Sequence, residues 1–289
     1  MDWYFILEIK KYFKYFHEIN ANSLIEKAYL FCSFLFYTKI IKHLKEYDFN
    51  NLIVFADMQP VDNLVSQYFG ALGKDTITLQ HGLFVNYEGF YNISSVSYKN
   101  VVSNHFLAWG NENKKLIQKY KPNCKVVVCG NPTIEPYRGD GQNSEFFTIF
   151  FDWDLFKNEN VEMINIAYKV SDALGIKFNL RMHPSNDKSN YKIDESYLIN
   201  NMDYKESMFM LGHTSSMIHI CQRLGMPVFK YDTNVPSSPV HDKSLFKKSE
   251  DVLVKVKDIN SYKDKYKNNI GPIGGESLEC YRIFFNSIK

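Results

Sequence analysis

The chain of 289 residues is long enough to bury a core, either as one large domain or as two domains of ordinary size. Its 34 Lys and Arg residues barely outnumber its 32 Asp and Glu residues, whereas a nucleic-acid-binding protein would show a marked basic excess, so we expect no nucleic-acid partner. The five cysteines are scattered without the paired spacing of a metal site or a disulfide framework, which favours a reducing, cytoplasmic location.

The first forty residues are rich in aromatic and aliphatic side chains. Residues 3–17 combine these side chains with Lys10, Lys11 and Lys14, a composition that suits either a core helix or a helix on an anionic membrane surface. We prefer core packing and keep contact with the inner face of the membrane as the alternative. The run 28–41 is shorter than the roughly 20 residues of a spanning helix, so it predicts a buried helix. No secretory signal is recognisable.

From residue 50 onward, short apolar runs alternate with helical patterns. The polar, aperiodic segment 83–104 interrupts this series, and long loops of that kind are usually functional. The predicted strands are 52–56, 76–80, 105–109 and 125–129, and the predicted helices are 61–72 and 111–120.

A second series follows residues 131–144, whose prolines, glycines and polar residues are typical of a linker. We therefore predict one domain over residues 1–135 and another over 145–289, with the last helix able to pack back on the first. The alternation predicts an α/β protein with two Rossmann-like, doubly wound domains that face a cleft, preceded by N-terminal helices. The strands of the second series are 146–151, 176–182, 207–211, 227–231 and 252–256, and its helices are 155–174, 214–225 and 276–288.

Polar residues stand where several of these strands end, and open α/β sheets bind ligands at that edge. In the second series they are Asp152, His183 and the hydroxyl turn Thr214, Ser215 and Ser216. Hydroxyl side chains make good helix caps, and a helix N-terminus can also hold a phosphate. Taken alone, the hydroxyl turn fits an ordinary capped helix as well as a phosphate site.

Two motifs together carry a family resemblance. Arg181-Met182-His183-Pro184, followed by Thr214-Ser215-Ser216, resembles the second domain of GT-B glycosyltransferases, especially bacterial sialyltransferases and related capsule-polysaccharide transferases. Leu79-Gln80-His81-Gly82 looks like a motif of surface-polysaccharide transferases. The resemblance implies a nucleotide-sugar donor, with a CMP-sialic-acid-like compound favoured. It also implies an oligosaccharide or lipid-linked glycan acceptor.

The resemblance further implies roles for individual residues. His183 would donate to the departing phosphate, so neither a divalent metal nor another cofactor is expected. His213 is placed beside this site, although a structural role explains it more simply. Asp152-Trp153-Asp154 has the metal-binding spacing of GT-A enzymes, but it opens a helix, where capping is the simpler reading. The predicted donor-binding residues are Arg181, His183, Pro184, His213, Thr214, Ser215 and Ser216.

A general base must take the proton of the acceptor hydroxyl. The resembling sialyltransferases use an acidic residue in an Asp/Glu-Asp/Glu-Gly motif, which this chain lacks. His81 is the first candidate because imidazole titrates near neutral pH, and Asp57 and Glu88 follow. Further candidates for the cleft, which also follow or end predicted strands, are Gly82, Gly130, Asn131 and Asp152.

Three other functions stay open at this point. A CDP-polyol phosphotransferase of the teichoic-acid type and a nucleotide-sugar 2-epimerase share the predicted fold. A non-catalytic nucleotide-sugar-binding subunit would keep the fold and lack the base. The epimerase should carry more acidic residues in its cleft. Product analysis distinguishes a glycosyltransferase, a phosphotransferase and an epimerase.

Overall fold

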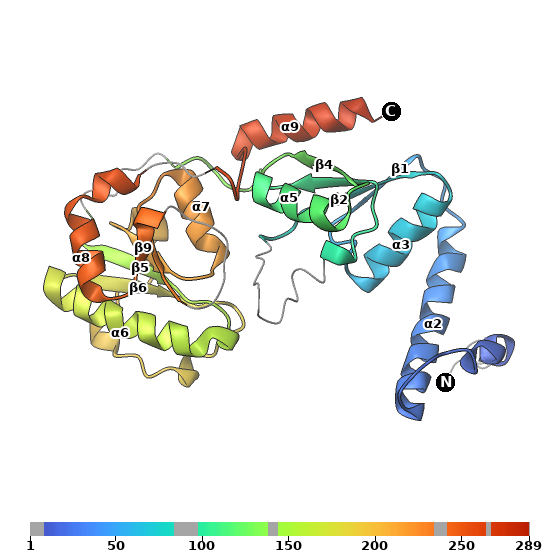
Figure 1. Cartoon of the computed structure of the whole chain (residues 1–289), viewed down its shortest axis with the longest axis horizontal. Coiled ribbons are helices and arrows are strands. Elements are labelled where there is room, and N and C mark those ends of the chain that lie inside the picture. Colours follow the sequence, from blue (N-terminus) through green and yellow to red (C-terminus); the bar gives the residue numbers. More distant parts are fainter. Residues whose placement is uncertain (1–8, 84–97, 138–143, 234–241, 264–266, 289) are drawn as a thin grey trace. The chain divides into compact units, whose positions relative to one another are not determined.

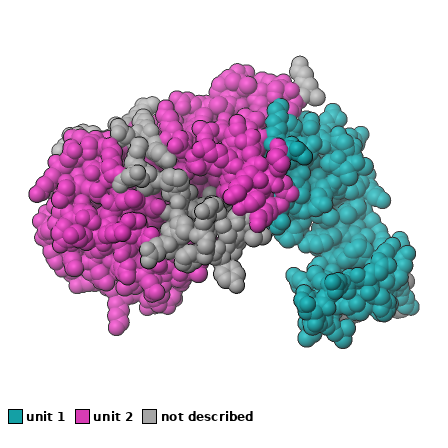
Figure 2. Space-filling model, viewed as in Figure 1, with its two compact units in different colours: residues 1–79, 100–106, 123–125 teal, residues 80–99, 107–122, 126–289 magenta. Residues whose placement is uncertain are grey.

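The computed structural model describes residues 9–83, 98–137, 144–233, 242–263 and 267–288 (Figure 1). Contacts divide the chain into two compact units, residues 1–79, 100–106 and 123–125, and residues 80–99, 107–122 and 126–289 (Figure 2). The strands are β1 (Asn51–Val54), β2 (Asp75–Leu79), β3 (His105–Ala108), β4 (Lys125–Val128), β5 (Phe146–Phe150), β6 (Lys177–Arg181), β7 (Met210–Gly212), β8 (Val228–Tyr231) and β9 (Leu245–Phe246). The α-helices are α2 (Leu24–Leu44), α3 (Pro60–Ala71), α5 (Asn111–Tyr120), α6 (Lys157–Leu174), α7 (Ser216–Leu224), α8 (Ser249–Lys257) and α9 (Gly274–Ser287).

The strands form two sheets, as the sequence predicts. The first has the order β1-β2-β3-β4, and the second has the order β6-β5-β7-β8-β9. In the first sheet β1 runs parallel to β2, with Asn51 opposite Asp75, and in the second β5 runs parallel to β6, with Phe146 opposite Lys177. This is the two-domain, Rossmann-like α/β architecture that the alternating pattern indicates.

Alternate side chains of β5 build the two apolar faces of the second sheet. Phe147 and Ile149 belong to a core that α6 and α8 cover, whereas Phe150 belongs to a core that α7 covers (Figure 1). Phe147 stacks on Phe209 with ring centroids 4.8 Å apart. A strand buried on both faces reads as a continuous apolar run, which is why Phe146–Phe150 was recognisable from sequence.

The prediction of a strand over residues 252–256 is wrong, because these residues belong to α8. Its valines alternate as in a strand, yet Val252 is fully buried and Val254 is 66% exposed. The carboxylate of Asp251 accepts the backbone N–H groups of Lys247 and Lys248 at 2.9 and 3.2 Å, which caps the helix. The fifth strand of this sheet is instead β9, which pairs with β8 in parallel.

Helix α2 is present where the sequence predicts a helix, but the expectation of a buried helix is wrong. Ser23 caps its N-terminus by accepting the backbone N–H of Glu26 at 3.1 Å. Only Phe31 and Leu35 of α2 are buried. Within the described ranges, no helix combines the length and the apolarity that crossing a membrane requires.

The segment before α9 packs tightly on the ends of β3 and β4, within one unit. The backbone N–H of Gly271 donates to the carbonyl of Trp109 at 2.7 Å, and that of Asn131 donates to the carbonyl of Pro272 at 3.0 Å. In α9, the hydroxyl of Ser277 donates to the carbonyl of Cys129 at 2.7 Å. The last helix therefore packs on the end of β4.

Candidate functional site

The turn after β6 fixes the ring of His183. Ser185 donates its backbone N–H to Nδ1 of His183 at 3.1 Å, and its Oγ lies 2.7 Å from the same nitrogen. Asn186 donates its backbone N–H to the carbonyl of His183 at 2.9 Å, which closes the turn that Pro184 begins. Because Nδ1 accepts, the neutral ring carries its proton on Nε2. Burial lowers the pKa of His183 and the charge of Asp154 opposes this, so the ring offers a neutral Nε2–H donor.

The carboxyl group of Asp152 is buried where β5 ends. Its Oδ1 accepts the backbone N–H of Trp153 at 2.8 Å, and its backbone carbonyl accepts from the side chains of Asn160 and Asn186 at 2.9 and 2.7 Å. Oδ2 has no hydrogen-bond partner among the described residues. Burial raises the pKa of Asp152 to about 6, although the Trp153 N–H lowers it. This carboxyl group can therefore accept from a ligand hydroxyl or, when protonated, donate to an anion.

Replacing Asp152 with asparagine is expected to stabilise the protein above pH 6 and not below pH 4. A carboxyl group whose pKa is raised in the folded state destabilises the protein once it is charged. Stability therefore falls as pH rises from the pKa of the unfolded state through that of the folded state. The rise from 3.8 to about 6 corresponds to at most about 3 kcal/mol at pH 8, and we expect about 2 kcal/mol because the bond from Trp153 weakens. Urea unfolding of both proteins at pH 4 and pH 8 measures this, and an equal effect at the two pH values would contradict it.

The end of β7 brings two more buried polar side chains to this edge of the sheet. His213 and Thr214 are 0% and 3% exposed, and in the described part of the chain both His213 nitrogens and Oγ1 of Thr214 lack a hydrogen-bond partner. Burial, followed by the charge of Lys230, lowers the pKa of His213 to about 4, so the ring is neutral at pH 7. Each unpaired group costs about 1–3 kcal/mol, a cost that a bound polar ligand would remove.

The N-terminus of α7 begins directly after these residues. Ser215 is the cap, and its Oγ accepts the backbone N–H of Met217 at 3.3 Å. The first turn of α7 contains no acidic residue, whereas the first turns of α2, α3, α5, α6, α8 and α9 each contain an Asp or Glu. No carboxylate of this first turn therefore neutralises the positive end of the helix dipole, which favours an anionic ligand at Ser216.

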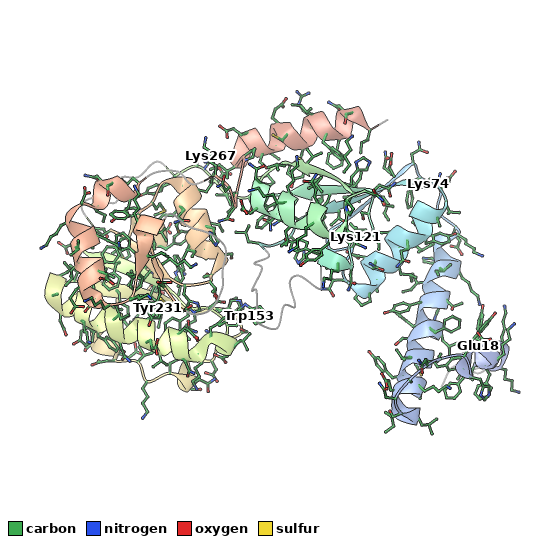
Figure 3. All side chains as sticks on the ribbon, in the orientation of Figure 1. Glu18, Lys74, Lys121, Trp153, Tyr231 and Lys267 are labelled. Atoms are coloured by element: carbon green, nitrogen blue, oxygen red, sulfur yellow. The ribbon has the colours of Figure 1, made fainter. Side chains whose placement is uncertain are left out.

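The order of the strands brings these groups to one edge. β5 lies between β6 and β7, with Phe150 opposite Arg181 and Ile149 opposite Leu211. The residues that follow these strands are therefore neighbours. The ring of Trp153 (labelled in Figure 3) also lies 6.2 Å from the ring of His183, centroid to centroid. We call the group formed by Asp152, His183, His213, Thr214, Ser215 and Ser216 the strand-end cluster.

Lys230 is a cation near this cluster that the sequence analysis missed. It lies on β8 opposite Gly212, the residue before His213. Burial lowers the pKa of Lys230, and Asp232 opposes this. A lysine inside the apolar strand Val228–Tyr231 was the available signal, because a charged side chain is uncommon in a strand whose other residues are buried; Lys230 itself is half-buried. Lys230 can supply positive charge toward a phosphate.

Three residues that the sequence motifs singled out do not belong to the strand-end cluster. Arg181 is exposed, and its guanidinium donates to the carbonyl of Met202 at 3.1 Å; Pro184 is exposed in the turn. In the Asp152-Trp153-Asp154 motif, Asp154 accepts from the hydroxyl of Tyr191 at 2.9 Å. Within the described ranges, no three carboxylate, imidazole or thiol groups are placed to share a metal ion.

The first sheet holds the candidates for the general base. Asp57 is fully buried, and its Oδ2 accepts the backbone N–H groups of Val102 and Ser103, both at 2.8 Å, so it fixes the chain before β3. His81 is exposed after β2, and the carbonyl of Gly82 accepts from Gln80 at 2.7 Å. The third candidate, Glu88, lies outside the described residues.

Gly130 and Asn131, which were predicted to face a cleft, pack against the segment before α9. Asn131 is 5% exposed, and its Oδ1 accepts the backbone N–H and the hydroxyl of Thr133 at 2.9 and 2.8 Å. Gly130 has φ +78°, and a Cβ there would lie 1.9 Å from the carbonyl oxygen of Pro272. Both residues therefore hold the segment before α9 in place.

No protein-family model and no curated protein matches this sequence. Solved structures do match. S. aureus MnaA with UDP is 15% identical with a TM-score of 0.56, covering 86% of this chain and 78% of its own. The UDP-GlcNAc 2-epimerase of Neisseria meningitidis bound to UDP-GlcNAc is 16% identical, with a TM-score of 0.56 and coverage of 94% and 87%. That of Methanocaldococcus jannaschii, with UDP-GlcNAc and UDP, is 14% identical, with a TM-score of 0.54 and coverage of 92% and 83%. The chain therefore shares the fold of these three proteins, two of which are bound to UDP-GlcNAc.

Proposed function

We propose that this protein binds a nucleotide-activated sugar at the strand-end cluster and transfers the sugar to a glycan acceptor. The observation that supports this most is the set of buried polar atoms of Asp152, His213 and Thr214, which have no hydrogen-bond partner among the described residues. They stand beside the N-terminus of α7, whose first turn carries no acidic residue. A nucleotide phosphate with an attached sugar supplies the negative charge and the hydroxyl groups that such a site would satisfy.

In the proposed reaction, an acceptor hydroxyl oxygen attacks the anomeric carbon of the donor. The bond from that carbon to the phosphate oxygen breaks, and the nucleotide leaves with the electron pair. Nε2–H of His183, the amides of α7 and Lys230 would stabilise the developing negative charge, and no divalent metal takes part in this proposal. The acceptor's proton passes to a base, for which His81 is our first candidate because Asp57 already holds two backbone amides.

The proposed substrates follow the resemblance of the two motifs. A CMP-sialic-acid-like donor and an oligosaccharide or lipid-linked acceptor of bacterial surface-polysaccharide synthesis are our first choice. Thermal-shift measurements with CMP-, CDP-, UDP- and GDP-activated compounds test the donor, because a specific ligand raises the unfolding temperature. No shift with any of them would contradict the proposal.

A nucleotide-sugar 2-epimerase is the second candidate, and the shared fold with two UDP-GlcNAc 2-epimerases favours it. An epimerase needs no acceptor and returns an altered nucleotide sugar. Incubating the protein with the donor that binds, with and without a glycan acceptor, separates the two functions. A new glycosidic bond and a free nucleotide support transfer, whereas an epimerised donor without acceptor supports the second candidate.

Replacing His183 with alanine is expected to lower kcat about hundredfold to thousandfold, with little effect on the free energy of unfolding. The loss follows from removing one donor to the leaving phosphate. Steady-state kinetics of the His183→Ala protein measure it, and His43→Ala is the control because His43 is an exposed imidazole on α2. Equal kcat values for the wild type and His183→Ala would remove His183 from the mechanism.

A further inference from the structure

Helix α2 has an exposed apolar face that has no role in the proposed reaction. Ile25, Tyr29 and Phe36 are 84%, 72% and 55% exposed, and Cys32 between them is also exposed. Their spacing of four, three and four residues places all four on one side of a helix. We call this set the α2 stripe.

The α2 stripe is separate from the face on which α2 packs. The other face carries Phe31 and Leu35, each 6% exposed. Phe31 meets the rings of Phe13 and Phe16 edge-on, with centroids 6.2 and 5.4 Å apart. In Figure 1, α2 meets α3 toward its carboxyl end and the N-terminal segment toward its amino end, all within one unit. The stripe is thus a second apolar face on a helix that already has its packing partner.

Positive charge is concentrated around this face. Residues 9–47 contain seven lysines and three glutamates, 7 − 3 = +4, whereas the whole chain carries +2, so the remainder carries 2 − 4 = −2. Lys39 and His43 are exposed and follow Phe36 at the same helical spacing. Lys14 and Lys42 lie over aromatic rings of the same segment, 4.8 and 5.5 Å from the ring centroids.

We propose that the α2 stripe docks on an anionic lipid bilayer, with its apolar side chains in the headgroup region and the lysines beside acidic headgroups. Apolar and aromatic side chains flanked by lysines are the composition that binds at a membrane interface. A symmetric dimer through the same face fits less well, because it would set one +4 segment against another. This surface is independent of the nucleotide-sugar site, so either proposal can fail without the other.

Flotation of the full chain with lipid vesicles tests the proposal. We expect binding to vesicles of phosphatidylcholine and phosphatidylglycerol, and at least about tenfold weaker partitioning to phosphatidylcholine alone. Raising the salt from about 0.1 M to about 1 M should weaken binding, since the Debye length falls from about 10 to about 3 Å. Equal binding to both kinds of vesicle, or binding to neither, would overturn the proposal.

A double substitution on α2 distinguishes vesicle binding through this face from nonspecific adsorption. Ile25→Ser with Phe36→Ser is expected to reduce partitioning at least about tenfold, because it removes most of the apolar area that would enter the bilayer. The matched control is Leu278→Ser with Ile283→Ser on α9, whose side chains are 59% and 58% exposed. Circular dichroism checks that both variants are folded. Equal losses in the two variants would overturn the assignment of the surface to α2.

Light scattering of the same proteins tests the dimer. A monomeric wild type that floats with anionic vesicles supports the proposal. A dimeric wild type that does not float, and that Ile25→Ser with Phe36→Ser converts to a monomer, would assign the stripe to a second copy of the chain and overturn the proposal.

Discussion

Glutamate in place of Ser216 is expected to weaken nucleotide-sugar binding at least about hundredfold while leaving the fold as stable as before or more so. A carboxylate at the first position of α7 would meet the donor phosphate, and like charges about 4 Å apart repel by about 4 kcal/mol near a protein surface. The same carboxylate interacts favourably with the helix dipole, by about 0.3–1 kcal/mol. Binding and stability therefore change in opposite directions, which a merely damaged site would not show.

Calorimetry with the compound that the thermal-shift panel selects measures the affinity, and urea unfolding measures the stability. Ser216→Gln is the matched control, because glutamine has nearly the same size and no charge. Equal affinities for the Glu and Gln proteins would mean that no phosphate binds at α7. Lower stability of the Glu protein would mean that the helix N-terminus is not available to a negative charge.

Alanine in place of Gly130 is expected to cost about 4 kcal/mol or more of the free energy of unfolding, one of the largest effects in this chain. Its φ of +78° is strained for any residue with a Cβ, and the added methyl group would overlap the carbonyl oxygen of Pro272 at 1.9 Å. The obstacle is backbone, and it also accepts the hydrogen bond from Asn131, so it cannot move without loss.

Gly175→Ala is the control for Gly130→Ala. Gly175 ends α6 with φ +66°, and no described atom lies within 4 Å of a Cβ added there. The two substitutions share the backbone strain, so Gly175→Ala should cost about 1–2 kcal/mol. The difference between the two denaturation midpoints reports the contact with Pro272. Equal midpoints would mean that the segment before α9 does not press on Gly130.

Local sequence patterns were sufficient to predict most of the helices and strands. Helix α5 was predicted at Asn111–Tyr120, where the structure has it, and its apolar residues recur at helical spacing. Residues 252–256 were misread as a strand because their alternating valines have the period of a strand. In the structure Val252 is buried, Val254 is exposed and Asp251 caps the start of the segment, as in a helix. The competing signal, Asp251 at the start of the run, was present in the sequence.

The candidate site was only partly visible in the sequence. His183 and Ser215 each carry a local signal, a proline or a helix start directly after a strand. The unpaired atoms of Asp152 and His213 depend on burial by side chains distant in the chain, which no local pattern reports. The packing role of Gly130 depends on Pro272, which lies beyond the entire second sheet in the sequence.

The return of the C-terminal segment to β4 affects how the chain assembles during translation. The bond from Ser277 to Cys129 joins residues 148 positions apart, and Gly130 fits against Pro272 only after the second sheet has been made. Contacts with such separation form late, because a long loop must close before they gain anything. The end of β4 thus emerges from the ribosome long before the residues that cover it, and it stays uncovered until Pro272 and Ser277 have also been synthesised.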